Sequence, residues 1–132
     1  MAGSPLEVRV RIAIRWRDLD MLGHLNQAVY HEFLEEGRAE IIRRLVAAGD
    51  GGTFVVARVE LDYRTEVRRD HEHVEVVVRP ERVGTSSVTL AHDVVLPDGT
   101  VAASGTSVLV GWDPAARGKR ELTEAERAAL QA

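Results

Sequence analysis

The segment Asp18–Tyr30, with the sequence DLDMLGHLNQAVY, joins an alternating apolar pattern to the chain's long helical pattern. It brings a carboxylate, a glycine and an imidazole to the start of a helix within a few residues. The first backbone N–H groups of a helix have no partner inside it, and they carry partial positive charge. Such donors suit the oxygen of a carbonyl group that is under attack. The segment therefore predicts a strand-to-helix junction that holds a candidate reaction site.

The patterns on either side of this junction predict a strand before it and a helix after it. Apolar residues alternate with arginines from Val8 to Trp16, which is typical of a half-buried strand. From Gln27 to Ala48 apolar residues recur at helical spacing, and Gly37 is the only glycine or proline in that run. The glycine-rich segment Gly49–Gly52 ends the predicted helix.

The remainder of the chain predicts a sheet and a short helix. Alternating apolar patterns predict strands in Val55–Val67, Val74–Val78, Val88–Leu96 and Val101–Trp112. Thr123 and Glu126 have capping-box spacing and open a short C-terminal helix. One helix can cover five strands only if the sheet curls around it. The expected fold is therefore α+β, with a curved antiparallel sheet of about five strands around one long central helix. Such a sheet keeps exposed edges, which favours edge pairing between subunits.

Composition limits the class of protein. A length of 132 residues predicts a single domain spanning 1–132. The 17 basic and 21 acidic residues give a net charge of −4 without a basic stripe, which disfavours nucleic acid as a partner. The absence of cysteine excludes disulfides, thiolate metal sites and cysteine nucleophiles. No signal core or membrane-length apolar run is present, so we expect a cytoplasmic protein without membrane contact.

Asp20 is the principal catalytic candidate. A carboxylate beside the free donors of a helix start could act as general base or as nucleophile. The alternative is that Asp18 or Asp20 only caps the loop or the helix, which is a common role for aspartate. Gly23 permits a close approach of backbone to a ligand. His24 could orient water or the carboxylate, although a lone loop histidine is more often a surface residue.

The other candidates are weaker when taken alone. Asn26 suits the N-cap position, which would also fix the backbone donor of Gln27. The segment Arg82–Ser87 includes Gly84, Thr85 and Ser86 and could cradle a phosphate or pantetheine, although turns favour these residues anyway. Arg117, Lys119 and Arg120 form a small basic cluster that could meet a nucleotide phosphate, with a solvated loop as the alternative. The five histidines have no metal-ligand spacing, so no metal site is expected.

The order of elements and the motif together resemble the hotdog-fold thioesterases of the 4-hydroxybenzoyl-CoA thioesterase type, the acyl-CoA thioester hydrolases. The resemblance covers nearly the whole chain. The matching positions are Asp18, Asp20, Gly23, Tyr30, Glu35, Arg38, Tyr63, Asp70, Arg82, Gly84, Ser86 and Ser87.

This resemblance implies roles for several residues. The second aspartate of the pair, here Asp20, is implied to activate water or to attack the thioester directly. The N–H group of Gln27 is implied to polarise the thioester carbonyl. His24 and Asn26 also match a His-Val-Asn-Asn run of plant acyl-carrier-protein thioesterases. Those enzymes have asparagine where this chain has Leu22, so the corresponding catalytic arrangement is incomplete here.

The resemblance also implies how substrate is bound. Coenzyme A would bind across subunit boundaries, so a homodimer or homotetramer is expected. The segment Arg82–Ser87 would contact pantetheine and phosphate, while Asn26, Tyr30 and Glu35 complete the set of substrate-binding candidates. Glu35 and Arg38 are interpreted as helix anchors, and the acidic position lies near the acyl pocket in some relatives. No cofactor is expected, since coenzyme A is part of the substrate.

The sequence therefore predicts hydrolysis of an acyl-CoA to free acid and coenzyme A. Two alternatives stay open. One is a thioesterase for acyl-carrier proteins in a biosynthetic pathway, and the other is a non-catalytic hotdog module that binds acyl thioesters. The low number of aromatic residues favours aliphatic over aryl acyl groups.

Overall fold

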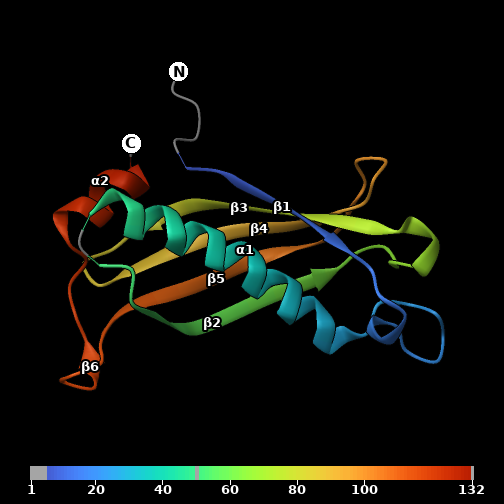
Figure 1. The fold of residues 1–132 in the computed structure, drawn as a ribbon, viewed down its shortest axis with the longest axis horizontal. Coiled ribbons are helices and arrows are strands. Elements are labelled where there is room, and N and C mark those ends of the chain that lie inside the picture. The colour runs from blue at the N-terminus through green and yellow to red at the C-terminus, as the bar shows by residue number, and fades with distance from the viewer. Residues whose placement is uncertain (1–5, 50, 132) are drawn as a thin grey trace.

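The computed structural model describes residues 6–49 and 51–131. Figure 1 shows a curved sheet with one long helix lying across a face of it. The strands pair antiparallel in the order β1-β3-β4-β5-β2, and a short strand β6 pairs with β5. The elements are β1 (Val8–Ala13), α1 (Gln27–Ala48), β2 (Phe54–Tyr63), β3 (His73–Val83), β4 (Ser87–Val95), β5 (Val101–Asp113), β6 (Gly118–Lys119) and α2 (Glu124–Gln131), with 3-10 turns at Trp16–Asp18 and Arg69–His71. The expected α+β architecture is confirmed.

Helix α1 packs closely on the sheet because its inward face combines branched apolar residues with a glycine. Phe33, Leu34, Ile41 and Leu45 on this face are buried in the core. At Gly37 an added Cβ would lie 2.7 Å from Val78 and 2.8 Å from Val76. Glycine at the middle of α1 therefore lets the helix axis approach β3, which outweighs its low helix propensity.

The predicted helix 27–48 is confirmed at both ends, but the first strand ends earlier than expected. β1 stops at Ala13, and the chain then makes a 3-10 turn over Trp16–Asp18. The prediction that Trp16 belongs to the buried face of the strand is wrong, because its side chain is 77% exposed. The turn rotates Trp16 outward, where the guanidinium group of Arg69 lies 5.7 Å from the ring centroid.

Strand β2 forms one edge of the sheet and leaves apolar side chains uncovered. It ends at Tyr63 instead of the expected Val67. A bulge between Val56 and Arg58 shifts its register against β5. Val55, Val56 and Tyr63 are exposed in the single chain. The apolar alternation that predicted a half-buried strand is therefore only partly realised, because Phe54, Val59 and Leu61 pack against the core while Val55, Val56 and Tyr63 stay exposed.

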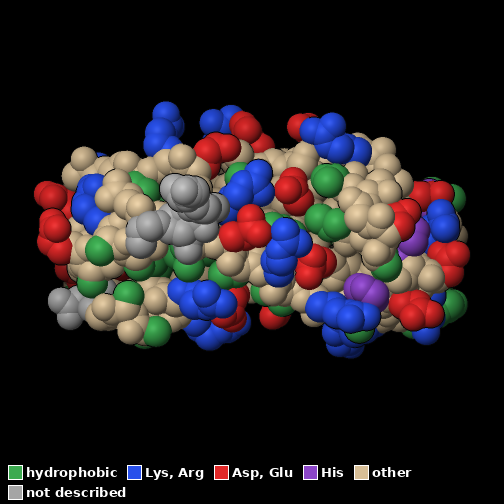
Figure 2. Space-filling view, turned by 90° about the horizontal axis from the view of Figure 1, so that it is seen from above, with side chains coloured by type: hydrophobic (Ala, Val, Ile, Leu, Met, Phe, Trp, Pro, Cys, Tyr) green, Lys and Arg blue, Asp and Glu red, His purple; other side chains and the backbone are tan. Residues whose placement is uncertain are grey.

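The surface carries both signs of charge. Figure 2 shows acidic and basic side chains interspersed over the face that it presents. Among the described residues, no helix combines the length and the apolar character that crossing a bilayer requires.

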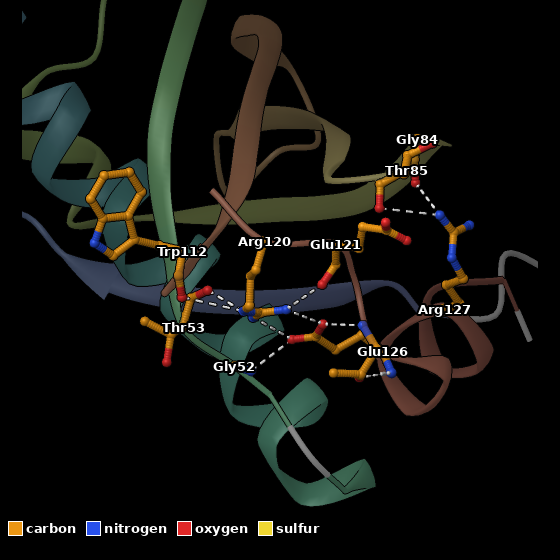
Figure 3. A network of polar contacts seen from close by, with 10 residues as sticks. Gly52, Thr53, Gly84, Thr85, Trp112, Arg120, Glu121, Glu126 and Arg127 are labelled. Atoms are coloured by element: carbon orange, nitrogen blue, oxygen red, sulfur yellow. Dashed lines mark hydrogen bonds and ion pairs between the residues drawn. The ribbon is translucent and has the colours of Figure 1, made fainter. Parts of the chain in front are cut away.

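A buried ion pair fastens helix α2 to the rest of the fold (Figure 3). The carboxylate of Glu126 is fully buried and accepts hydrogen bonds from Arg120 at 2.8 and 2.9 Å. It also accepts from the backbone N–H groups of Gly52, at 2.7 Å, and Thr123, at 2.8 Å. The Thr123 hydroxyl accepts from the N–H of Glu126 at 3.0 Å, so the predicted capping box is confirmed. The carboxylate thereby ties α2 to the segment that leads into β2.

Replacement of Glu126 by glutamine is expected to lower the free energy of unfolding by about 3 kcal/mol at neutral pH, because it leaves Arg120 without its counter-charge. Burial alone would raise the pKa of Glu126, but its hydrogen bonds with Arg120, Thr123 and Gly52 outweigh burial and lower it. Its charge therefore stabilises the fold above the ordinary glutamate pKa, and this contribution fades as the pH falls through the lowered value. Urea denaturation at a series of pH values from neutral to acidic should show the free energies of unfolding of the wild-type protein and Glu126→Gln becoming equal. A constant difference would contradict this assignment.

Candidate active site

A cleft of about 480 Å³ opens between the start of α1 and the end of β2. The strand-to-helix junction contributes Asp20, His24 and Gln27 to its lining. Tyr30 of α1 and Tyr63 of β2 face it from two sides. The structure thus brings together three of the four predicted catalytic residues and the predicted substrate-binding residue Tyr30.

Asp20 is held by a tight turn that uses one of its two carboxylate oxygens. Its Oδ1 accepts hydrogen bonds from the backbone N–H groups of Leu22, at 2.9 Å, and His24, at 3.1 Å. The N–H group of Gly23 donates to the carbonyl of Asp20 at 3.0 Å, and Gly23 has a φ of +78°, which favours glycine. Among the described residues no donor occupies Oδ2 of Asp20. Asp20 therefore caps its own turn and still presents a free oxygen at the cleft.

Asp18 has a different environment and a structural role. It is 1% exposed and forms an ion pair with Arg15 at 2.8 Å, while its Oδ2 accepts from the Arg15 backbone N–H at 2.7 Å. Burial would raise the pKa of Asp18, but the hydrogen bonds and charge of Arg15 outweigh it and lower the pKa. The alternative that an aspartate caps this loop is thus realised most fully by Asp18.

The start of α1 leaves one backbone donor free. Asn26 is the N-cap, as predicted, because its Oδ1 accepts from the N–H of Ala28 at 2.9 Å. The carbonyl of Asn26 accepts from the N–H of Val29, also at 2.9 Å. No described residue accepts from the N–H of Gln27. The free donor and the free oxygen of Asp20 therefore belong to residues that line the same cleft.

His24 is paired with Glu66, a residue that the sequence analysis did not single out. The His24 Nε2 lies 2.5 Å from Oε1 of Glu66, and both side chains line the cleft. A backbone bridge between His24 and Arg68 holds the two segments side by side. Glu66 stood among the polar residues of an expected strand, and no local pattern marks its contact with His24. The contact depends on the fold.

The two tyrosines form an aromatic wall. Their rings meet edge to face at 4.9 Å with an interplanar angle of 82°. Burial, with a smaller contribution from Tyr63, raises the pKa of Tyr30 to about 12. The phenol of Tyr30 therefore stays protonated and neutral near physiological pH.

Other predicted binding residues lie away from this cleft. Glu35 borders a separate cavity further along α1. Arg82 lies near the end of β3, and Gly84, Thr85 and Ser86 form the turn between β3 and β4, at the end of the sheet opposite to the cleft (Figure 1). Arg127 of α2 donates to the carbonyl of Gly84 at 2.6 Å. Their proposed contact with coenzyme A stays a prediction.

The predicted basic cluster is smaller than expected. Arg120 is engaged with Glu126, which leaves Arg117 and Lys119 on the surface. Within the described part of the chain, no group of three or more His, Cys, Asp or Glu residues is arranged to hold a metal ion.

Comparisons with known proteins agree with the fold. The arrangement of a curved sheet around one long helix is that of the hotdog-fold thioesterases, and a structure from Bacillus stearothermophilus described as a predicted thioesterase matches with a TM-score of 0.86, at 25% identity, over 96% of this chain and 95% of that one. The model of the thioesterase-like superfamily matches residues 14–130, and the chain belongs to this family.

Two further relatives are similar to this chain. A thioesterase of Thermus thermophilus, solved with coenzyme A and Zn, is 37% identical, with a TM-score of 0.83 over 99% of this chain and 95% of that one. The uncharacterized protein YsmA of Bacillus subtilis is 28% identical over 102 residues, which cover 76% of this chain and 69% of YsmA.

The two neighbouring aspartates should respond differently to replacement by asparagine. Asp18→Asn removes the charge from a buried pair and is expected to lower the free energy of unfolding by about 1–3 kcal/mol. Asp20→Asn keeps an amide oxygen that can accept both turn N–H groups, so we expect a change below about 0.5 kcal/mol. Urea denaturation of both variants measures this. If Asp20→Asn lowered the free energy of unfolding more than Asp18→Asn, the structural role assigned to Asp18 would be contradicted.

Proposed function

We propose that this protein hydrolyses acyl-CoA thioesters to the free acid and coenzyme A. The observation that carries the proposal is that Asp20 and the unpartnered N–H of Gln27 line one cleft. Membership in the thioesterase-like superfamily and the coenzyme A complex of a relative with 37% identity support the same reaction class. A cytoplasmic location is part of this proposal.

In this mechanism the thioester carbonyl oxygen accepts a hydrogen bond from the N–H of Gln27. The helix dipole adds partial positive charge at this point. The hydrogen bond and the attraction to the dipole both become stronger as negative charge develops on the carbonyl oxygen. Asp20 then acts in one of two ways. It removes a proton from water as the water oxygen bonds to the carbonyl carbon, or its own oxygen attacks that carbon to give an anhydride that water hydrolyses. In both routes the carbon–sulfur bond breaks and the thiolate takes up a proton.

His24 is the group proposed to supply that proton. Glu66 pairs with Nε2 of His24, while the N–H of His24 donates to Asp20 through the backbone. The contact with Glu66 fixes the orientation of the imidazole at the cleft. The scheme uses groups of the chain, the substrate and water, and it proposes no metal and no separate cofactor.

Self-association is part of the proposal. β2 is an edge strand with exposed Val55 and Val56, and edges of this kind are commonly covered by pairing with a second copy. Since Tyr63 at the end of β2 lines the cleft, pairing through β2 would set each cleft at a subunit boundary. A homodimer or homotetramer could bring the turn Arg82–Ser86 of another subunit to the nucleotide part of coenzyme A.

Replacement of Asp20 by asparagine or alanine is expected to lower kcat by about 10²–10⁴, because neither residue can accept a proton or attack the thioester. A free-thiol assay with a panel of acyl-CoAs measures turnover. Asp98→Asn is the matched control, since Asp98 also caps an exposed turn, by accepting from the N–H of Thr100 at 2.9 Å, but lies outside the cleft. Unchanged turnover in the Asp20 variants would remove this mechanism. Binding of acyl-CoA by the wild-type protein without any turnover would favour the non-catalytic module.

His24→Ala is expected to lower kcat by about tenfold to a hundredfold, as loss of a proton donor predicts. Glu66→Gln should cost less, and the double variant should be no slower than His24→Ala, because Glu66 acts through His24. Steady-state kinetics of the three variants form a double-mutant cycle. Losses that multiply independently would show that Glu66 and His24 do not work as a pair.

A further inference from the structure

A second cavity, of about 180 Å³, lies between α1 and β2, further along the helix from the candidate active site. Ile42, Phe54 and Leu109 give it largely apolar walls, and Glu35 stands at its exposed rim. Arg38 is the buried polar residue in this lining. A cavity with apolar walls and a single buried charge is suited to a mainly apolar ligand that carries one polar group.

The guanidinium group of Arg38 is buried without a counter-charge. Its side chain belongs to a residue that is 7% exposed, and its Nη1 donates to the Ser107 hydroxyl at 3.2 Å. No carboxylate among the described residues lies within ion-pairing distance of it. Burial lowers the pKa of Arg38, and the more distant charge of Glu35 opposes this shift, but a guanidinium group remains charged at physiological pH. Donors of Arg38 therefore remain available for an acceptor from outside the chain.

The polar side chains next to Arg38 supply few hydrogen-bond acceptors for it. The Ser107 hydroxyl is shared with His92, whose Nε2 lies 2.9 Å from it. The Nδ1 of His92 is buried and has no hydrogen-bond partner among the described residues. This contrasts with Glu126, whose buried carboxylate meets four N–H donors. A buried cation in a partly satisfied cluster costs stability, which indicates a role other than packing.

The second cavity and the candidate active site are both lined by residues of α1 and β2. Tyr30 and Arg38 are eight positions apart on α1, which corresponds to a rise of about 12 Å. On β2, Tyr63 lines the first site and Phe54 the second. Between them Val59 and Leu61 are partly buried apolar residues that pack against the core. An acyl chain whose thioester lies at Gln27 would cross this apolar stretch and end near Arg38.

We propose that this second cavity binds the far end of the acyl group, and that Arg38 there selects acyl chains that end in a carboxylate. The preferred substrates would be CoA monothioesters of linear dicarboxylic acids long enough to reach from Gln27 to Arg38. This inference rests on the proposed function. The negative charge of Glu35 at the rim would repel a substrate carboxylate that stayed at the entrance. A carboxylate that reached Arg38 would instead be attracted.

Matched pairs of substrates test the proposal: octanoyl-CoA against suberoyl-CoA, and decanoyl-CoA against sebacoyl-CoA. The readout is the ratio of kcat/KM within each pair, which cancels any general loss of activity. The wild-type protein should favour the carboxylated member of at least one pair by about tenfold to a hundredfold, as a charge-assisted hydrogen bond predicts. Arg38→Met should abolish or invert the ratio, mainly through KM. Arg44→Met, which alters an exposed arginine of the same helix, is the control and should keep it.

Thermal stabilisation by free sebacate, compared with decanoate, gives a readout that needs no catalysis. Sebacate should stabilise the wild-type protein and lose this effect in Arg38→Met and, if methionine prevents folding, in Arg38→Gln. Arg38-dependent stabilisation without hydrolysis of any acyl-CoA would support the cavity and contradict the proposed function. Hydrolysis without preference for the carboxylated members, and without an effect of sebacate, would overturn the inference and leave the proposed function standing.

Discussion

The capping of α1 by Asn26 is the interaction on which the candidate site depends. Its side chain and its carbonyl take up the N–H groups of Ala28 and Val29, and the N–H of Gln27 is left over. An uncapped helix start would offer several donors to water, whereas this one offers a single donor with a fixed direction. The N–H of Asn26 is bound in turn to the carbonyl of Asp18 at 2.8 Å, so the donor and the Asp20 turn belong to one rigid junction. Preorganised donors of this kind need no reorganisation during a reaction.

The way in which charges are buried separates the structural from the functional groups. Asp18 and Glu126 are buried carboxylates with arginine partners and backbone donors, and they hold the junction and the C-terminal helix in place. Asp20 and Glu66 are more accessible and keep capacity for substrate. Arg38 departs from both patterns, because it is buried and yet lacks a counter-charge among the described residues. A satisfied network stabilises a fold, while an unsatisfied buried charge marks a place where an outside group can bind.

Local signals in the sequence predict the type and order of the long helix and the main strands, and part of the site. Helix 27–48 was predictable at both ends because Asn26 and Gly49 act on the adjacent turns of the chain. Trp16 was placed wrongly because the apolar alternation continues beyond the strand, and only the Arg15–Asp18 pair shows that the chain turns there. The contact of His24 with Glu66, and that of Arg38 with Ser107, join residues far apart in the sequence. Such contacts follow from strand register and from the path of a loop, which no short motif records.

The most direct test of the account removes the N–H group of Gln27 without removing the helix. Proline is favoured at the first helical position, and Asn26 before it already has the extended conformation that proline requires, with φ −63° and ψ 136°. Gln27→Pro should therefore fold normally, yet lower kcat for acyl-CoA hydrolysis by about 10²–10³, whereas Gln27→Ala, which keeps the donor, should remain near the wild-type rate. Equal rates for a folded Gln27→Pro and for Gln27→Ala would contradict the claim that this backbone donor stabilises the reacting carbonyl.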